Sequence, residues 1–144
     1  MTLCPDPGTR AENARNALRR YGQKRARLQV LQERLREGTE GQRQVANMKS
    51  DELGEKLWLE LIAKRATHLR MRIIGIEQEV KLIELALQDM AYVPWAVALL
   101  EEYYFRDRSA VEMCFKMGYS QRQFFRRLAA AVDLFAEEWM GGME

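Results

Sequence analysis

The chain has 144 residues, of which 47% are hydrophobic and 31% are charged, enough for one folded domain or a small domain with a helical extension. Three prolines and nine glycines are few, which favours long helices over turn-rich β structure. No apolar run approaches the ~20 residues of a transmembrane helix, and no apolar stretch near the start is typical of a signal peptide. The sequence therefore predicts a cytoplasmic protein without a membrane-spanning segment.

Residues that usually bind metals or carry out catalysis are scarce. Cys4 and Cys114 lie far apart, and His68 is the single histidine. No other Cys or His lies close to them in sequence, and we find neither a glycine-rich phosphate loop nor a nucleophile–base pair. We expect no metal site, no cofactor and no enzymatic activity.

The first predicted helix covers residues 9–37, which are strong helix formers. Thr9 and Glu12 form a capping-box pattern at its start, and the Gly-Thr-Glu-Gly sequence at 38–41 predicts its end. Residues 8–38 hold nine Lys or Arg against three Glu, a net charge of +6. Such a run is usually a solvated helix face. Contact between this basic helix and nucleic acid remains the open alternative.

A second long helix is predicted to begin at Ser50-Asp51-Glu52, where acids suit the helix N-terminus. Its apolar positions alternate in steps of three and four over about four heptads, the pattern of a coiled coil or long hairpin. They are Leu59, Ile62, Ala66, Leu69, Ile73, Ile76, Val80, Ile83, Leu87 and Met90. The first helix or a second copy of the chain is the antiparallel partner. We expect this arm to self-associate, because an uncovered seam would leave much apolar surface in water.

The long helix breaks at Tyr92-Val93-Pro94, which places a domain boundary between residues 91 and 92. Pro94 suits the first position of a helix over 94–105. Ser-x-x-Glu at 109–112 and Ser-x-x-Gln at 120–123 are capping boxes that predict helices over 110–117 and from 121 toward 139. Gly118 is placed to adopt the left-handed conformation that ends the shorter helix.

Two short-spaced helices joined by Gly-Tyr-Ser, the second longer and basic at its start, are typical of a helix-turn-helix. Residues 116–127 contain four cations and no acid. In such a motif the start of the second helix enters the major groove, where Arg can bond guanine and Gln can bond adenine. Tyr119, Ser120 and the helix N-terminal N–H groups suit phosphates.

We expect Gln121, Arg122, Gln123 and Arg126 to contact base edges or the groove wall, because Arg122 and Arg126 are four residues apart and share a helix face. Arg127, rotated by ~100° from Arg126, is assigned to phosphates together with Lys116. Phe124 is expected in the core, and Phe125 either packs on the helix over 94–105 or lies beside the DNA backbone. The candidate DNA-binding residues are Lys116, Tyr119, Ser120, Gln121, Arg122, Gln123, Arg126 and Arg127.

The segment "MGYSQRQFFRRLAAAVDLFAEEW", residues 117–139, resembles the C-terminal signature of phage-encoded transcriptional regulators of the ArpU and RinA kind. Their signature has Gly-Tyr-Ser, polar residues, an aromatic–Arg step and an Ala-rich run. The preceding "VALLEEYYFRDRSAVEMCFKMG" resembles the rest of their domain, which is similar to the σ-factor region 4 helix-turn-helix. The resemblance covers about residues 92–139. It implies activation of phage or prophage late genes, with Gln121, Arg122, Gln123 and Arg126 in the DNA-facing segment. The chain departs from the pattern at Arg127, where the related domains often have an apolar residue.

Taken together, these patterns predict an all-α protein with a helical hairpin or coiled-coil arm over residues 1–91 and a helix-turn-helix domain over 92–144. Its expected function is sequence-specific binding of double-stranded DNA as a phage or prophage regulator in the bacterial cytoplasm. The arm would bind a second copy of the chain or RNA polymerase. Two alternatives are a DNA-packaging protein of small-terminase type, in which the DNA-binding part usually comes first, and a helical interaction protein that binds no DNA.

Overall fold

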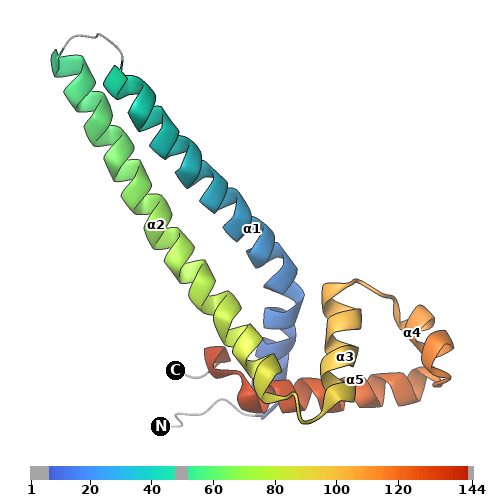
Figure 1. Ribbon diagram of the computed structural model, residues 1–144. Coiled ribbons are helices and arrows are strands. Elements are labelled where there is room, and N and C mark those ends of the chain that lie inside the picture. The colour runs from blue at the N-terminus through green and yellow to red at the C-terminus, as the bar shows by residue number, and fades with distance from the viewer. Residues whose placement is uncertain (1–6, 48–51, 143–144) are drawn as a thin grey trace, which may run out of the picture. The chain divides into compact units, whose positions relative to one another are not determined.

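The computed structural model describes residues 7–47 and 52–142, all in helices or the short turns between them, and the predicted all-α class is confirmed. Figure 1 shows the order of the elements along the chain. The long helices are α1 (Pro7–Asn47) and α2 (Glu52–Asp89). The shorter elements are α3 (Pro94–Leu100), the π-helical turn η1 (Glu101–Phe105), α4 (Ala110–Met117), α5 (Gln121–Glu138) and the 3₁₀ turn η2 (Met140–Gly142).

The chain divides into two compact units. One, which we call the arm unit, is Lys24–Gln78, and the other, the terminal unit, combines the residues up to Gln23 with those from Glu79 onward. The start of α1 and the end of α2 therefore belong with the shorter helices. The domain boundary after residue 91, inferred from the break before Pro94, stays a prediction from the sequence.

The arm unit is held together by contact between α1 and α2. Leu31 of α1 packs with Leu69 and Ile73 of α2, and Leu28, Leu35 and Ile76 lie against this cluster. All ten predicted seam positions, nine in α2 and Met90 directly after its end, are buried or half-buried, as the heptad pattern requires. α1 covers the part of the seam around Leu69 and Ile73, which fits the predicted hairpin.

Both predicted ends of the first helix are wrong. α1 begins at Pro7, so Thr9 lies inside the helix rather than at its cap. Proline is favoured in the first helical turn because the N–H that it lacks would have no partner there. At the other end α1 continues through Gly38 and Gly41 to Asn47. A glycine costs a helix only about 1 kcal/mol relative to alanine, and neither residue blocks a backbone hydrogen bond as proline would.

The second helix begins at Glu52 as predicted, while Ser50 and Asp51 lie outside the described residues. The predicted helix over 94–105 is present, but its last five residues widen into the π-helical turn η1. The predicted helices over 110–117 and from 121 to about 139 are confirmed within a residue at each end.

The core of the terminal unit is formed by the apolar face of α5 and the helices packed on it. Both α3 and α4 pack against α5. Buried residues of α5 recur every three or four positions, as expected for one face of a helix. They are Phe124, Leu128, Ala131, Val132, Phe135 and Ala136, and the facing helices contribute Ala96, Leu99 and Leu100 of α3 and Met113 of α4.

Candidate nucleic-acid interface

The start of α5 is fixed by local hydrogen bonds. Ser120 accepts a hydrogen bond from the Gln123 backbone N–H at 3.2 Å, and the Gln123 side-chain oxygen accepts one from the Ser120 backbone N–H at 3.0 Å. This complete capping box satisfies two backbone donors at the helix start. At the end of α4, Gly118 has φ 71° and its N–H reaches the Cys114 carbonyl. The predicted left-handed glycine is therefore confirmed.

At the start of α4 the structure shows one of the two hydrogen bonds of a capping box. The Ser109 hydroxyl accepts a hydrogen bond from the Glu112 backbone N–H at 3.1 Å. Before it, the polar turn 106–109 contains Asp107 at φ 52°, and aspartate tolerates this left-handed conformation better than most residues. The two caps and Gly118 thus set where α4 and α5 begin and how the chain turns between them.

Packing under α5 leaves its polar start exposed. Phe124 is fully buried, as predicted, and its ring lies 5.6 Å from that of Tyr103 and 5.3 Å from that of Phe125. Phe125 itself remains exposed. Since Phe124 fixes the inward direction, the opposite side of the first turn faces solvent.

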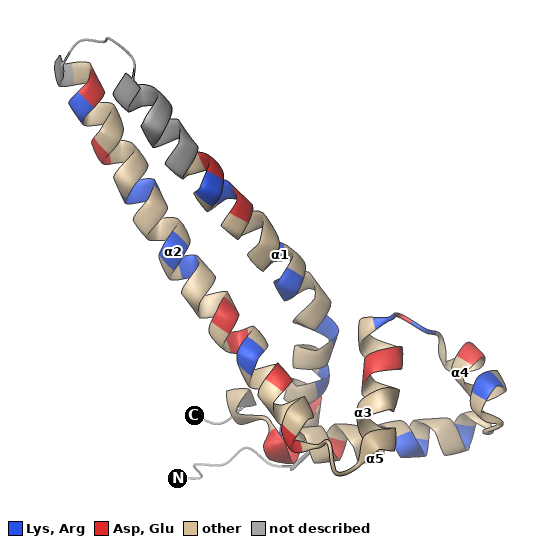
Figure 2. Cartoon of the chain, in the orientation of Figure 1, with Lys and Arg blue, Asp and Glu red and all other residues tan. Residues whose placement is uncertain are grey.

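The structure brings the candidate residues together around the α4–α5 turn. Seven of the eight have exposed side chains and Tyr119 is half-buried. The exposed ones are Lys116, Ser120, Gln121, Arg122, Gln123, Arg126 and Arg127. Figure 2 shows basic residues along this part of α5 with no acid between them, while acids appear further along the helix. An acid-free, cationic helix start of this kind attracts phosphate.

Arg127 is positioned differently from the other arginines of α5. Its guanidinium carbon lies 5.2 Å from the ring centroid of Trp95 and 5.2 Å from that of Tyr119. Both distances are within the range of cation–π attraction, so α3 and the α4–α5 turn together hold this side chain.

Sequence reasoning did not assign Trp95 to the site. Its side chain is 42% exposed, although most tryptophans are largely buried. The only sequence signal is its place directly after Pro94 at the start of α3, which does not reveal that residue 127 is a neighbour. The contact depends on the crossing of α3 and α5 and is visible only in the fold.

Gln123 has two predicted roles that compete. An amide side chain needs both its oxygen and its nitrogen for a bidentate bond to adenine. In the structure the Gln123 oxygen already accepts the Ser120 N–H. The side-chain nitrogen remains available as a donor, so Gln123 can contact a base or phosphate acceptor without opening the cap.

Glu102 neutralises two arginines next to the candidate interface. It forms ion pairs with Arg106 (2.7 Å) and Arg108. Desolvation would raise the pKa of Glu102, but the hydrogen bond from Arg108 and the positive charges of Arg106, Arg108 and Lys116 outweigh it and lower the pKa below 4.5. Arg106 and Arg108 are therefore paired within the protein, unlike Arg122 and Arg126 of α5, which form no ion pair among the described residues.

The basic start of α1 partly serves the terminal unit itself. Arg10 donates a hydrogen bond to the Ala136 carbonyl at 3.2 Å, close to the C-terminus of α5, where the last carbonyls lack helical partners. Burial raises the pKa of Tyr104, and the nearby charges of Arg19 and Arg15 partly oppose this shift. The Tyr21 ring lies 4.4 Å from that of Phe105. Some of the cations at the start of α1 thus take part in contacts within the terminal unit and do not form a free basic face.

An apolar pair on α4 was not predicted. Val111 is 74% exposed and Phe115 is 92% exposed. They are four residues apart and lie on one helix face, away from the buried Met113. A phenylalanine so exposed offers a surface for another molecule.

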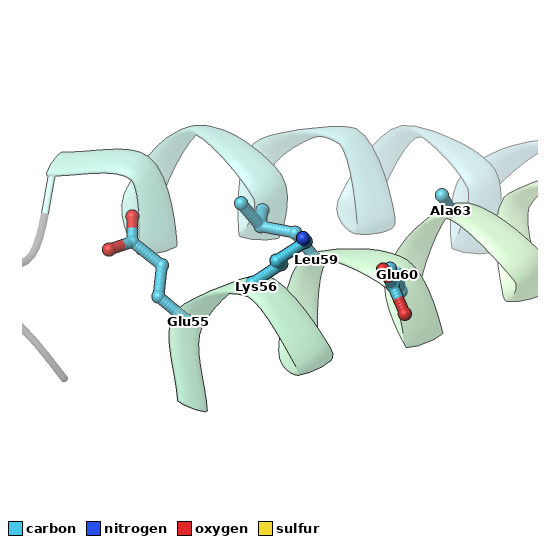
Figure 3. Close-up of a pocket in the computed structure, with 5 residues that line it drawn as sticks. All are labelled: Glu55, Lys56, Leu59, Glu60 and Ala63. Carbon is cyan, nitrogen blue, oxygen red and sulfur yellow. The ribbon is translucent and has the colours of Figure 1, made fainter. Parts of the chain in front are cut away.

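Other site types find little support in the described residues. A shallow groove of ≈ 430 Å³ on α2 is lined by Glu55, Lys56, Leu59, Glu60 and Ala63, shown in Figure 3. It holds carboxylates and one lysine but no histidine, cysteine or hydroxyl that could act as a nucleophile. Within 7–47 and 52–142, no cluster of His, Cys, Asp or Glu fits a metal ion, and no helix is long and apolar enough to cross a membrane.

Comparison with known proteins gives no relative. No family model, no curated protein and no solved structure matches the chain.

Proposed function

We propose that the terminal unit binds double-stranded DNA through the start of α5 and that the protein is a sequence-specific transcriptional regulator. The observation that supports this most is the exposed, acid-free group of Gln and Arg side chains at a fully capped helix start. A helix N-terminus of this kind fits the major groove, and its side chains are donors for base edges and phosphates. The resemblance of residues 92–139 to phage regulators supports a role at phage or prophage late genes.

The roles of the residues follow from their directions on α5. Arg122 and Arg126 share one exposed face, and no hydrogen bond or ion pair within the described residues holds either of them. We assign them to base edges together with Gln121. Arg127, held between Trp95 and Tyr119, presents its N–H groups from a restricted position and is assigned to a phosphate with Lys116, Tyr119 and Ser120. Gln123 supports the helix start and adds one donor.

The oligomer and RNA polymerase belong to the same proposal. A dimeric regulator reads two half-sites with two copies of the helix start, which raises both affinity and specificity. The arm is the element proposed to pair the copies. RNA polymerase is the further partner that we propose for activation of a promoter.

One observation favours a second candidate, a helical interaction protein that binds no DNA. The exposed Val111 and Phe115 on α4 present an apolar surface that DNA would not cover as well as a protein would. DNA-binding regulators also contact proteins, so this pair alone does not replace the proposal. In the first candidate the arginines of α5 bind DNA, whereas in the second they do not.

Binding to a duplex selected from random sequences, and to its scrambled version, separates the candidates. Arg122→Ala and Arg126→Ala should each weaken binding to the selected duplex by about 1–3 kcal/mol and relax preference at one base. Arg127→Ala should weaken both duplexes alike and reduce the slope of log Kd against log salt by about one unit. Lys81→Ala, an exposed cation on α2, is the matched control and should bind like the wild type. Unchanged affinity and salt slope in all three α5 variants would refute the proposal.

A further inference from the structure

The arm unit has two different edges along the contact between α1 and α2. Gln32 and Glu77 form a hydrogen bond of 3.4 Å across one edge. Each directly follows a residue of the packed cluster, Gln32 after Leu31 and Glu77 after Ile76. A residue that follows a seam position is rotated by about +100° from it, and one that precedes a seam position is rotated by about −100°. In an antiparallel pair, rotations of the same sign face the same edge.

Four arginines line the opposite edge. Arg27 and Arg34 of α1 directly precede Leu28 and Leu35, and Arg65 and Arg72 of α2 directly precede Ala66 and Ile73. Each pair is seven residues apart, which places its members on one helix face about 10 Å apart along the axis. We call these four residues the arginine row. Figure 2 shows basic residues along the middle of both helices.

The arginine row is accessible and largely uncompensated. The side chains of Arg27, Arg34 and Arg65 are exposed and that of Arg72 is half-buried. Within the described part of the chain, no hydrogen bond or ion pair holds any of the four. Glu33 directly precedes Arg34 and Glu37 follows it by three residues, and among the described residues neither forms an ion pair with it. On α2, residues 61–76 contain no acid at all.

An aromatic side chain continues the row. Trp58 directly precedes the seam residue Leu59 and lies seven residues before Arg65, so it belongs to the same edge. It is exposed. Arginines for phosphates next to an aromatic ring for sugars or bases are the combination that nucleic-acid-binding surfaces use.

We propose that the arginine row is a second nucleic-acid contact, which binds the sugar–phosphate backbone without reading sequence. It goes beyond the proposed interface at α5, because it lies in the arm unit and uses other residues. Guanidinium groups suit phosphate through paired N–H donors, and a row without acids attracts a continuous polyanion. Glutamine replacements remove the charge and keep helix propensity, so they test the row without disturbing the hairpin.

The experiment measures binding of the full chain to the selected and scrambled duplexes over a salt series. Arg65→Gln/Arg72→Gln and Arg27→Gln/Arg34→Gln should each weaken both duplexes alike, by on the order of tenfold, and lower the salt slope by about 1.8 units. Arg65→Lys/Arg72→Lys should keep most of the slope, because the charge remains. The matched control is Arg36→Gln/Arg70→Gln, which removes two exposed cations of the same helices outside the row and should bind like the wild type.

The outcomes separate this inference from the proposed function. If row variants bind like the control while Arg122→Ala loses affinity, the row is refuted and the α5 interface stands. Loss in the row variants with normal binding by the α5 variants supports the row and refutes the α5 interface. Poly-L-glutamate is the probe for an acidic polypeptide partner. Should it compete for the row-dependent binding as well as DNA of equal charge does, the nucleic-acid assignment is overturned.

Discussion

Single residues decide which of the many cations of this chain are free to bind another molecule. Arg106 and Arg108 lie close in sequence to the candidate interface, yet Glu102 pairs with both. Arg10 donates a hydrogen bond to the Ala136 carbonyl near the end of α5. Net charge over a stretch of sequence counts all of these alike, which is why the structure is needed to separate internal cations from available ones.

The first prediction concerns the pH dependence of stability at Glu102. Its folded pKa lies below the ordinary 4.5, so its ion pairs stabilise the fold above that pH, and the contribution is lost as pH falls through the lowered value. Glu102→Gln should therefore be less stable than wild type near neutral pH. The difference should shrink at acidic pH well below 4.5, as the wild-type carboxylate becomes protonated through its lowered pKa. Urea unfolding of both proteins at the two pH values measures this.

Glu101→Gln serves as the control for this prediction. Glu101 is the neighbouring half-buried carboxylate, and it takes no part in the ion pairs of Glu102. Its replacement should change stability little and with little pH dependence. An equal deficit of Glu102→Gln at both pH values would mean that packing of the side chain, rather than its charge, stabilises the turn.

At the scale of elements, caps could be predicted because they depend on residues three or four positions apart. Ser109, Gly118 and Ser120 mark the ends of α4 and α5 in the sequence as they do in the structure. The end of α1 could not be predicted in this way. A glycine permits a helix end without requiring one, and α1 continues past Gly38. Contacts between elements, such as Trp95 with Arg127, leave no local signature either.

The second prediction compares the two serine caps. Ser120→Ala and Ser109→Ala should each reduce the free energy of unfolding by about 1 kcal/mol. We expect the larger loss at Ser120, because its box has both hydrogen bonds, whereas for Ser109 the structure shows the bond from Glu112 to its side chain. Denaturant unfolding measures both. Ser120→Thr, which keeps a hydroxyl, should recover most of the loss, and neutral effects of both alanine variants would contradict the assigned helix starts.

At the scale of the whole molecule, the heptad pattern predicted which face of α2 is buried but not what remains exposed. The seam is buried or half-buried at all ten positions. The expectation of self-association therefore cannot rest on apolar seam residues exposed to water. Other apolar residues of α2 are exposed, among them Met71 at 67% and Ile74 at 49%. A repeat identifies the strongest apolar face, and isolated apolar residues outside it are not distinguished from ordinary surface residues.

The third prediction is that the protein self-associates through the outward face of α2. Met71 and Ile74 are three residues apart and lie on one face, with Leu57 two heptads before Met71. Burying such side chains against a second copy contributes about 1.5–3 kcal/mol each. Met71→Gln/Ile74→Gln should therefore raise the dimer dissociation constant at least about tenfold in sedimentation equilibrium. Val111→Gln, which removes an exposed apolar residue of α4 instead, should leave the dissociation constant unchanged.

Wild-type protein that remains monomeric at high concentration would contradict self-association. A dimer unaffected by the double substitution would instead place the contact on another face, and loss of the dimer in Val111→Gln would place it at α4.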